Sequence, residues 1–539
     1  MSMKRRIRKV AILGSGVMGS AIACHFANIG CQVMLLDIAP NELTPEETAK
    51  GLTLESKIVR NRIVQTSFDR SIKSSPAPLF AKRFISRITL GNFTDDMPRI
   101  KDCDWTIEVV VENLGIKKKV YEEVEKYRTP GTLITSNTSG IPIRLMAEGR
   151  SDDFKKNFCG THFFNPPRYL RLLEIIPNQF TDPETVKFLM HYGDLYLGKT
   201  TVLCKDTPAF IANRIGVYGI MKVLDSMQKL GLNIDEVDKL TGPVIGRPKS
   251  ATFRTTDIVG LDTMIKVSNN LHEALPQDEA RETFAVHEVI LKMEQNKWLG
   301  DKTGQGFYKK SKNAKGETEI LTLDLKTLQY GEKTKAKFGT LEATKPIDNL
   351  KQRFPVLLSG TDKAGDFYRD TFYSIFSYVS NRIPEITDEL YKIDDAVCAG
   401  FGWELGPFET WDAVGVEKSV KAMEAAGKQP NRWVYEMLSA GHKSFYKIEN
   451  GLRTYYDIPS KSYKIIPGKE EFIILENLSD KIIWKNAESK ITDLGDGVIN
   501  FGWHSKSYTL GSPVMEGLNK AIDLAEKDYT GLVIGHQGS

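Results

Sequence analysis

At 539 residues the chain is long enough for several domains, and its 41% hydrophobic and 26% charged residues are ordinary for a globular protein. A formal net charge of +4 is small for this length and gives no reason to expect a nucleic acid as partner. Six cysteines without any C-x-x-C pair argue against a zinc site or a disulfide framework. No apolar run approaches the roughly 18 residues that cross a bilayer. We therefore expect a cytoplasmic protein with no metal and no membrane or nucleic-acid partner.

The N-terminal part of the chain alternates between apolar strand-like runs and helical segments. A helix is predicted over 21–29, and strands are predicted over 10–13, 32–36, 105–111, 132–136, 157–164 and 172–176. Such alternation is typical of an α/β fold with a mostly parallel sheet and helices on both faces.

A glycine-rich turn follows the first predicted strand and begins the helix. It has the pattern G-x-G-x-x-G, in which the three glycines are Gly14, Gly16 and Gly19. Val17 and Met18 lie between the second and the third glycine. Gly14 permits a tight turn, Gly16 allows the backbone to approach a pyrophosphate, and Gly19 allows close helix–strand packing. The alternative is an ordinary glycine-rich turn.

Asp37 ends the second predicted strand, 18 residues after Gly19. A carboxylate at this spacing accepts hydrogen bonds from the ribose hydroxyls of NAD, and it repels the additional phosphate of NADP. The following residues, Ile38 and Ala39, provide no arginine to compensate. The sequence therefore predicts NAD as the cofactor.

His162 and Glu174 lie in two neighbouring predicted strands. A carboxylate inside the apolar run Leu172–Ile176 costs several kcal/mol unless it is paired. A neighbouring or antiparallel strand that carries His162 would provide the partner, and the pair would orient the ring as a general base. The alternative is a histidine packed in the core.

Three polar side chains lie near predicted element ends. Asn137 and Ser139 follow the strand 132–136, at the edge where ligands bind in parallel sheets, although Ser139 could equally cap a helix. Asn213 lies in a predicted helix over 209–230, where a structural role is an equal alternative.

A basic set precedes the third predicted strand and includes Lys57 and Arg60. It could attract phosphate groups, and a solvated helix face is the alternative.

An internal repeat marks the middle of the chain. Residues 234–237 and 256–260 are echoed by residues 393–396 and 411–415, which indicates a duplicated helical domain. Phe372 has the same spacing to the second copy as Asn213 has to the first, so we expect the second copy to lack the polar residue. After the repeat, a strand over 498–503, a helix over 513–526 and a strand over 531–535 are predicted.

Taken together, these motifs resemble the 3-hydroxyacyl-CoA dehydrogenase family. The resemblance runs over roughly residues 7–310 and rests on GSGVMGSAIA, VVVENLGIKKKV, SNTSG, GTHFFNPP, KDTPAFIANR, GRPKSATFRTTDIVGLDT and KTGQGFY. It implies an NAD-dependent oxidation of 3-hydroxyacyl-CoA to 3-ketoacyl-CoA in fatty acid β-oxidation.

The resemblance also implies roles for individual residues. His162 would be the general base and Glu174 its partner, and Ser139 and Asn213 would hold substrate oxygens. The cofactor would be bound by the glycine turn and by Asp37, Glu112, Lys117, Asn137 and Asn165. The basic segment with Lys57 and Arg60 would receive coenzyme A.

The whole chain resembles the front part of a bifunctional dehydrogenase/enoyl-CoA hydratase. We expect a Rossmann-type NAD-binding domain over 1–204 and two all-α, 6-phosphogluconate-dehydrogenase-like copies over 205–312 and 363–455, joined by a connector over 313–362. Residues 490–539 would begin a crotonase-type domain, incomplete here, so we expect no hydratase activity from these 539 residues.

Two rival functions remain at this stage. A dehydrogenase of free 3-hydroxy acids would share the cofactor turn but tends to use a lysine base. A non-catalytic NAD-binding or structural protein would retain the fold alone. As partners we expect an acyl-CoA thioester, and either a second copy of the chain or an internal pairing of the two helical copies.

Overall fold

The computed structural model describes residues 5–313, 315–468, 470 and 472–537. Contacts between residues divide the chain into two units, Met1–Leu438 and Ser439–Ser539. Each unit is described by itself.

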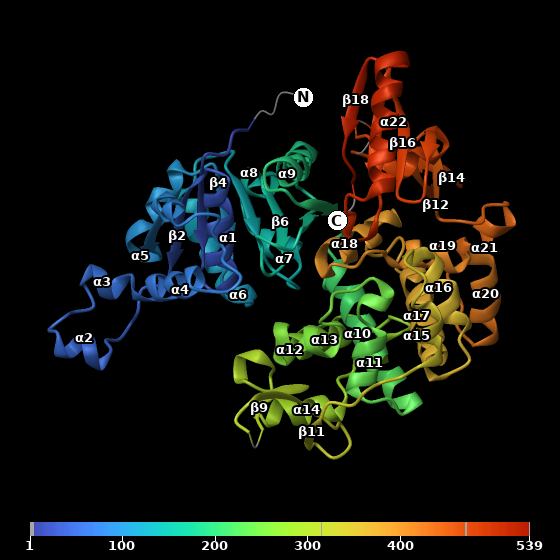
Figure 1. The fold of residues 1–539 in the computed structure, drawn as a ribbon. Coiled ribbons are helices and arrows are strands. Elements are labelled where there is room, and N and C mark those ends of the chain that lie inside the picture. The colour runs from blue at the N-terminus through green and yellow to red at the C-terminus, as the bar shows by residue number, and fades with distance from the viewer. Residues whose placement is uncertain (1–4, 314, 469, 471, 538–539) are drawn as a thin grey trace. The chain divides into compact units, whose positions relative to one another are not determined.

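An eight-stranded sheet forms the N-terminal part of the first unit (Figure 1), with the strand order β3-β2-β1-β4-β5-β6-β7-β8. Its strands are β1 (Lys9–Leu13), β2 (Gln32–Asp37), β3 (Ile88–Asn92), β4 (Trp105–Glu108), β5 (Leu133–Ser136), β6 (Phe158–Phe163), β7 (Leu172–Pro177) and β8 (Thr200–Leu203). Strands β1 to β6 run parallel, β7 is antiparallel to β6, and β8 is parallel to β7. This topology confirms the predicted doubly wound α/β fold, while the two edge strands β3 and β8 were not predicted.

Nine α-helices connect or follow these strands: α1 (Val17–Asn28), α2 (Pro45–Ala49), α3 (Lys57–Arg60), α4 (Arg62–Ile72), α5 (Phe93–Asp96), α6 (Leu114–Tyr127), α7 (Ile143–Ala147), α8 (Asp152–Lys156) and α9 (Pro183–Leu195). The segment with α2 and α3 extends away from the sheet (Figure 1). In the core, the buried Trp105 contacts Phe26 of α1 and Tyr192 of α9, with ring centroids 5.2 and 5.9 Å away. Burial of such side chains stabilises the fold by about 1.5–3 kcal/mol each.

Two helical copies follow. The first comprises α10 (Ala212–Leu230), α11 (Ile234–Leu240), α12 (Phe253–Val259), α13 (Leu261–Ala274) and α14 (Glu288–Gln295). The second comprises α17 (Lys363–Asn381), α18 (Tyr391–Phe401), α19 (Pro407–Val414), α20 (Val416–Ala425) and α21 (Arg432–Ser439). Gly260 and Gly415 join the third helix of each copy to the fourth with φ of +104° and +93°, a conformation that favours glycine. The matching helix order agrees with the predicted duplication.

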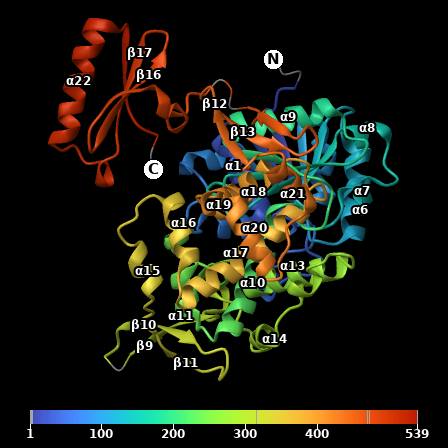
Figure 2. The ribbon, with the colours of Figure 1, turned by 90° about the vertical axis from the view of Figure 1, so that its right-hand side faces the viewer.

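The two copies pack against each other through α10 and α17, which lie side by side (Figure 2). The rings of Tyr218 and Tyr378 stack with centroids 3.8 Å apart, and the Ser226 hydroxyl donates to Asp370 at 2.6 Å. The connection from α17 to α18 spans residues 382–390, whereas that from α10 to α11 spans only 231–233. The predicted counterpart of Asn213, Phe372, is therefore wrong: alignment of the helix ends gives Ala364, which is buried and also apolar.

The connector between the copies has a small antiparallel sheet and two helices. Its elements are β9 (Tyr308–Lys312), β10 (Thr318–Leu323), β11 (Tyr330–Glu332), α15 (Gly339–Thr344) and α16 (Leu350–Ser359).

The second unit contains two further sheets. One consists of β12 (Tyr446–Glu449), β13 (Leu452–Asp457) and β14 (Ser462–Ile465), and the other of β15 (Ile482–Lys485), β16 (Ser489–Gly495), β17 (Val498–Trp503) and β18 (Gly531–Ile534). Helix α22 (Ser512–Asp528) packs on β16 and β17 (Figure 2), and buries Val514 and Ala521 against Ile491 and Phe501. The predicted strand–helix–strand order is confirmed, since β18 pairs parallel to β17.

Candidate active site

The glycine turn joins β1 directly to α1, which begins at Val17, one turn earlier than predicted. Gly14 has a φ of +109°, and a Cβ there would lie 2.6 Å from the Val109 carbonyl oxygen. A Cβ on Gly19 would lie 1.8 Å from the Gly14 carbonyl oxygen, whereas one on Gly16 would meet no atom within 4 Å. Gly14 and Gly19 are thus required by the fold, and Gly16 faces open space at the positive end of a helix whose first turn has no acidic residue.

Asp37 lies at the carboxyl end of β2, beside this turn. Its Oδ2 accepts hydrogen bonds from the Ser15 amide at 2.6 Å and from the Ser15 hydroxyl at 2.5 Å. The carboxylate is therefore fixed next to the residues that would bind a dinucleotide. It can accept hydrogen bonds from the ribose hydroxyls of NAD, and the amides at the start of α1 can donate to the pyrophosphate.

The turn also lines a cleft of about 390 Å³. Ser15, Gly16 and Val17 form one side, and Asn165 with the loop 166–168 forms another. The cleft thus brings Asn165, which precedes a cis proline, close to the glycine turn.

His162 and Glu174 face each other across the antiparallel strands β6 and β7. His162 Nδ1 lies 2.7 Å from Glu174 Oε2; the Glu174 side chain is 0% exposed and that of His162 is 8% exposed. When Nδ1–H donates its hydrogen bond to the Glu174 carboxylate, the Nε2 lone pair is left to act as a base. The predicted contact is present in this geometry.

The other oxygen of Glu174 fixes the start of the first helical copy. Oε1 accepts from the Ile211 amide at 3.1 Å and from the Ala212 amide at 2.8 Å. Helix α10 begins at Ala212 and not at 209, because Ala209 and Phe210 have positive φ of 59° and 53°. One buried carboxylate therefore links the histidine to the helix turn that carries the half-buried Asn213.

Aromatic rings and the second helical copy enclose the histidine. The rings of Phe164 and Phe210 lie 4.7 and 5.7 Å from the His162 ring. Phe401, at the end of α18, contacts Phe164 at 6.0 Å, and Gly400 packs against Leu172 of β7. Helix α18 of the second copy thus forms part of the wall behind the dyad.

The loop after β5 carries Asn137 and Ser139. The Asn137 side-chain oxygen accepts from the Phe163 amide at 2.9 Å, so this loop is attached to the strand of His162. The Glu112 carboxylate accepts from the amides of Ser139 and Gly140 at 3.0 and 3.1 Å. The structure therefore groups Asn137, Ser139 and Glu112 at the carboxyl ends of β4, β5 and β6.

Lys117 and Glu112 form an ion pair of 3.4 Å, and Lys117 is only 1% exposed. Burial raises the pKa of the Glu112 carboxyl, but Lys117 and the hydrogen bonds from Thr138 and Ser139 outweigh it, so the pKa lies below its usual value. Glu112 is thus held as a carboxylate.

Sequence reasoning missed Glu108, at the end of β4. This fully buried carboxylate accepts from Lys117 Nζ, the Tyr121 hydroxyl and the Ser136 hydroxyl at 2.7–2.8 Å. Its place inside the predicted apolar strand 105–111 could have indicated it, because a carboxylate buried among apolar residues requires a partner.

Sequence reasoning also missed Lys199, which is 4% exposed just before β8. Its ammonium group donates to the carbonyl oxygens of Pro167 and Leu170, the latter at 2.8 Å, and so holds the loop that follows Asn165. Burial lowers the pKa of Lys199 from 10.5 to about 8.

The predicted coenzyme A residues lie on the projecting segment. Arg60 forms two hydrogen bonds with Asp95, at 2.6 and 2.7 Å, and a third with Glu55, whereas Lys57 is exposed. The structure thus commits Arg60 to carboxylates of the chain itself.

Within the described residues, no cluster of three or more His, Cys, Asp or Glu side chains could hold a metal ion. In the same part of the chain, every helix is too short or too polar to cross a membrane.

Comparison with known proteins identifies the family. The model for the 3-hydroxyacyl-CoA dehydrogenase NAD-binding domain matches residues 9–207, and the model for the C-terminal domain of the same family matches residues 210–310. A Bacillus subtilis protein named as a 3-hydroxyacyl-CoA dehydrogenase is 47% identical over 99% of this chain and 67% of its own length. The chain belongs to the 3-hydroxyacyl-CoA dehydrogenase family. It is accordingly an NAD-dependent oxidoreductase whose sheet domain binds the cofactor.

Two further relatives of this 3-hydroxyacyl-CoA dehydrogenase extend the comparison. A Rickettsia felis protein, named as a fatty acid oxidation complex trifunctional enzyme, is 31% identical over 100% of this chain and 68% of its own length. The crystal structure of 3-hydroxybutyryl-CoA dehydrogenase from Escherichia coli K12 has 22% identity and a TM-score of 0.57, and covers 81% of this chain and 99% of that one. At this identity the likeness concerns the fold.

Proposed function

We propose that this dehydrogenase oxidises the 3-hydroxyl group of (S)-3-hydroxyacyl-CoA thioesters to a ketone in fatty acid β-oxidation. The observation that carries the proposal is the buried 2.7 Å contact between His162 Nδ1 and Glu174. It leaves Nε2 available as a base in a chain whose glycine turn and Asp37 fit NAD. The name of the Rickettsia felis relative supports the metabolic context.

His162 would remove the hydroxyl proton through Nε2, and Glu174 would stabilise the imidazolium that forms. Both side chains are nearly excluded from water, which strengthens their interaction as the proton moves. NAD, when bound, supplies the acceptor for the hydride from C3.

Ser139 and Asn213 would hold the substrate oxygens. Two sets of hydrogen bonds support this role: the Ser139 loop is attached to the His162 strand through Asn137, and Asn213 follows the amides that Glu174 binds. Such positioning would fix the hydroxyl group against Nε2.

The cofactor would be bound by Gly14, Gly16, Gly19, Asp37 and the first turn of α1 with Val17 and Met18. Asn137 and Asn165 would contact the cofactor or the groups beside it. Glu112 and Lys117 would lie on the nicotinamide side, where their ion pair would hold the loop 138–140 in place. Lys57 and Arg60 would meet the phosphates of coenzyme A, and Arg60 would have to share its charge with Asp95.

For the domains, we propose an NAD-binding domain over 1–204, helical copies over 205–312 and 363–455 with a connector over 313–362 between them, and crotonase-type structure over 490–539. The packing of α10 against α17 supports an internal pairing of the two helical copies.

The decisive assay follows NADH absorbance with NAD and 3-hydroxybutyryl-CoA, and compares NADP as cofactor and free 3-hydroxybutyrate as substrate. Turnover with NAD and the thioester that is lost in His162→Ala supports the proposal. Equal turnover with the free acid would favour a hydroxy-acid dehydrogenase. NAD binding without turnover of either compound would favour a non-catalytic protein.

A further inference from the structure

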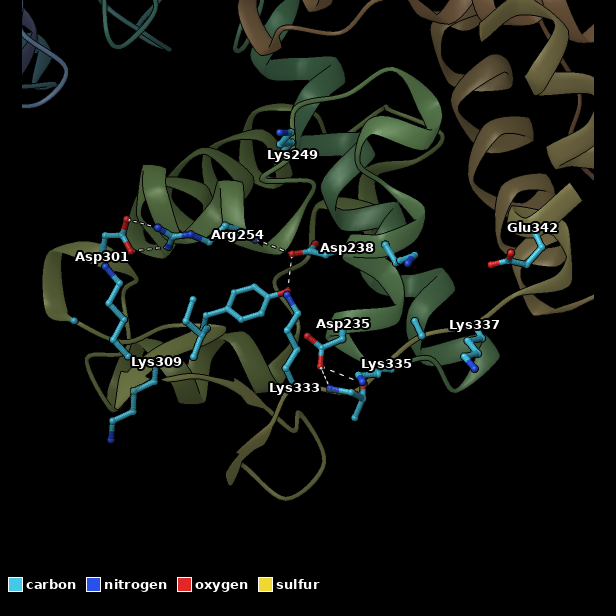
Figure 3. Close-up of a pocket in the computed structure, with 17 residues that line it drawn as sticks. Asp235, Asp238, Lys249, Arg254, Asp301, Lys309, Lys333, Lys335, Lys337 and Glu342 are labelled. Carbon is cyan, nitrogen blue, oxygen red and sulfur yellow. Dashed lines mark hydrogen bonds and ion pairs between the residues drawn. The ribbon is translucent and has the colours of Figure 1, made fainter. Parts of the chain in front are cut away.

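A second, lysine-rich cavity lies between the first helical copy and the connector. Its volume is about 1130 Å³, and its lining comes from α11, the loop before α12, β9 and the segment 333–337. It shares no residue with the cleft at the glycine turn or with the His162 dyad. Figure 3 shows Lys249 on one side of this cavity and Lys333 and Lys335 on the opposite side.

The cavity has an excess of positive charge. Seven lysines and one arginine line it, against four acidic residues. Among the described residues, none of the seven lysines forms an ion pair within 4.0 Å; the lysines are Lys239, Lys249, Lys309, Lys310, Lys333, Lys335 and Lys337. Their charge is thus available to a ligand.

All four acidic residues are already satisfied by the chain. Asp238 accepts from three backbone amides, at 2.8–3.1 Å, and from the Tyr308 hydroxyl at 2.7 Å. Asp235 accepts from Thr322 and Thr334, Asp301 pairs with Arg254 at 2.6 Å, and Glu342 pairs with Lys345. The four carboxylates are therefore already bonded within the chain and leave the lysine charge largely uncompensated.

The lining also limits the kind of ligand. Protein partners are usually anchored by apolar and aromatic side chains at the centre of an interface. Here the exposed apolar side chain is Ile320, and the ring of Tyr308 is buried. A small ligand recognised through its charge fits this cavity better than a protein surface.

We propose that this cavity, which we call the lysine groove, binds a chain of adjacent phosphate groups, either free or as part of a nucleotide. Lys333, Lys335 and Lys337 all belong to the short segment that follows β11, and Lys333 and Lys335 lie on one side of the cavity (Figure 3). Several ammonium groups in one cavity can each pair with a different phosphate oxygen of the same polyanion. Lys249 lies on the opposite side, and Lys239 of α11 also lines the cavity. The shared chemistry is a polyphosphate anion, and the two sources are separated by experiment.

The test is isothermal titration of inorganic pyrophosphate, and separately of ATP, into the full chain saturated with NADH, in a buffer of about 50 mM ionic strength. We expect one additional site for each chain. K333E/K335E/K337E should weaken binding by about 30-fold or more, and K239E/K249E by about tenfold, because each change replaces a favourable charge by a repulsive one. Equal affinities for the two probes would indicate recognition of phosphates alone, and tighter binding of ATP would assign part of the site to the nucleoside.

A matched control removes the same charge elsewhere. K266E/K297E/K326E reverses three exposed lysines that do not line the groove, and should change the affinity by less than about threefold. The proposal is overturned if neither probe binds at about 1 mM, if the control weakens binding as much as K333E/K335E/K337E, or if only an RNA strand binds. The two groove variants change different segments of the chain, so if one variant fails to fold, the other still tests the proposal.

Discussion

Glu174→Gln is the substitution that tests the role of the buried dyad most sharply. The glutamine can still accept from the Ile211 and Ala212 amides at the position of Oε1, so the start of α10 keeps its partners. Its amide group, however, would point an N–H at His162 Nδ1, which lies 2.7 Å from the present Oε2. The imidazole would then place its proton on Nε2 and could no longer accept the substrate proton.

The expected loss follows from two contributions. A charge-assisted hydrogen bond to the imidazolium contributes about 1.5–3 kcal/mol, and general-base catalysis as a whole contributes about 10²–10⁴-fold. We therefore expect kcat to fall by about 10²–10⁴-fold, or about 2.7–5.4 kcal/mol in activation free energy. KM should change little, since the change affects the proton transfer more than ground-state binding.

The assay is NADH formation in a double-mutant cycle. If Glu174 acts through the histidine, Glu174→Gln should change the residual rate by less than about threefold in a His162→Ala background. Circular dichroism and the melting temperature report whether each variant remains folded. A folded Glu174→Gln enzyme with kcat within about threefold of wild type would refute the reasoning, as would full additivity of the two losses.

Three further predictions concern the cofactor turn and a buried lysine. Gly19→Ala should destabilise the fold by about 1–3 kcal/mol or more, because its Cβ would lie 1.8 Å from the Gly14 carbonyl oxygen. Gly16→Ala should leave the melting temperature unchanged and weaken NAD binding about tenfold. Thermal unfolding measures the loss of stability, and NADH fluorescence titration measures the loss of cofactor binding. Equal melting temperatures for the two variants would contradict a structural role for Gly19 alone. Asp37→Asn should lower the ratio of kcat/KM for NAD over NADP by at least about tenfold, since the charge that repels the additional phosphate is removed; an unchanged ratio would exclude Asp37 from cofactor selection. The pKa of Lys199 is lower in the folded chain than in the unfolded chain, so the unfolded chain binds more protons between pH 8 and pH 10. The free energy of unfolding of wild type should therefore rise over this window by up to about 2 kcal/mol relative to Lys199→Met. Urea unfolding at the two pH values measures it, and parallel curves for the two proteins would contradict it.

The sequence predicted those parts of the site in which a residue type is unusual for its local structure. A carboxylate in an apolar strand requires a partner, which led from Glu174 to His162, and the glycine spacing led to the turn before α1. Lys199 was missed because it is a single charged residue at the edge of a strand, where solvent exposure is the usual outcome. Glu108 lies inside the predicted strand 105–111, as Glu174 does in its strand, but the sequence did not indicate which residues would be its partners. Their partners come from segments 9 to 32 residues away in the chain, which no local pattern specifies.

Element boundaries were shifted where tertiary contacts override local preference. Helix α10 begins three residues late because Ala209 and Phe210 adopt positive φ where Glu174 binds the following amides. The edge strands β3 and β8 were missed because neither has a long apolar run, and each is completed by pairing with a neighbour. The lysine groove was not predicted, since its lining comes from the first helical copy and from the connector, which meet only in the folded chain.

The central claim is tested most directly by isotope transfer. (S)-3-hydroxybutyryl-CoA that carries deuterium at C3 is incubated with NAD and the purified chain, and the reduced cofactor is analysed by mass spectrometry. The account predicts one deuterium in each NADH formed by wild type and far slower formation by His162→Ala. NADH without deuterium, or no NADH from a folded chain that binds NAD, would contradict it.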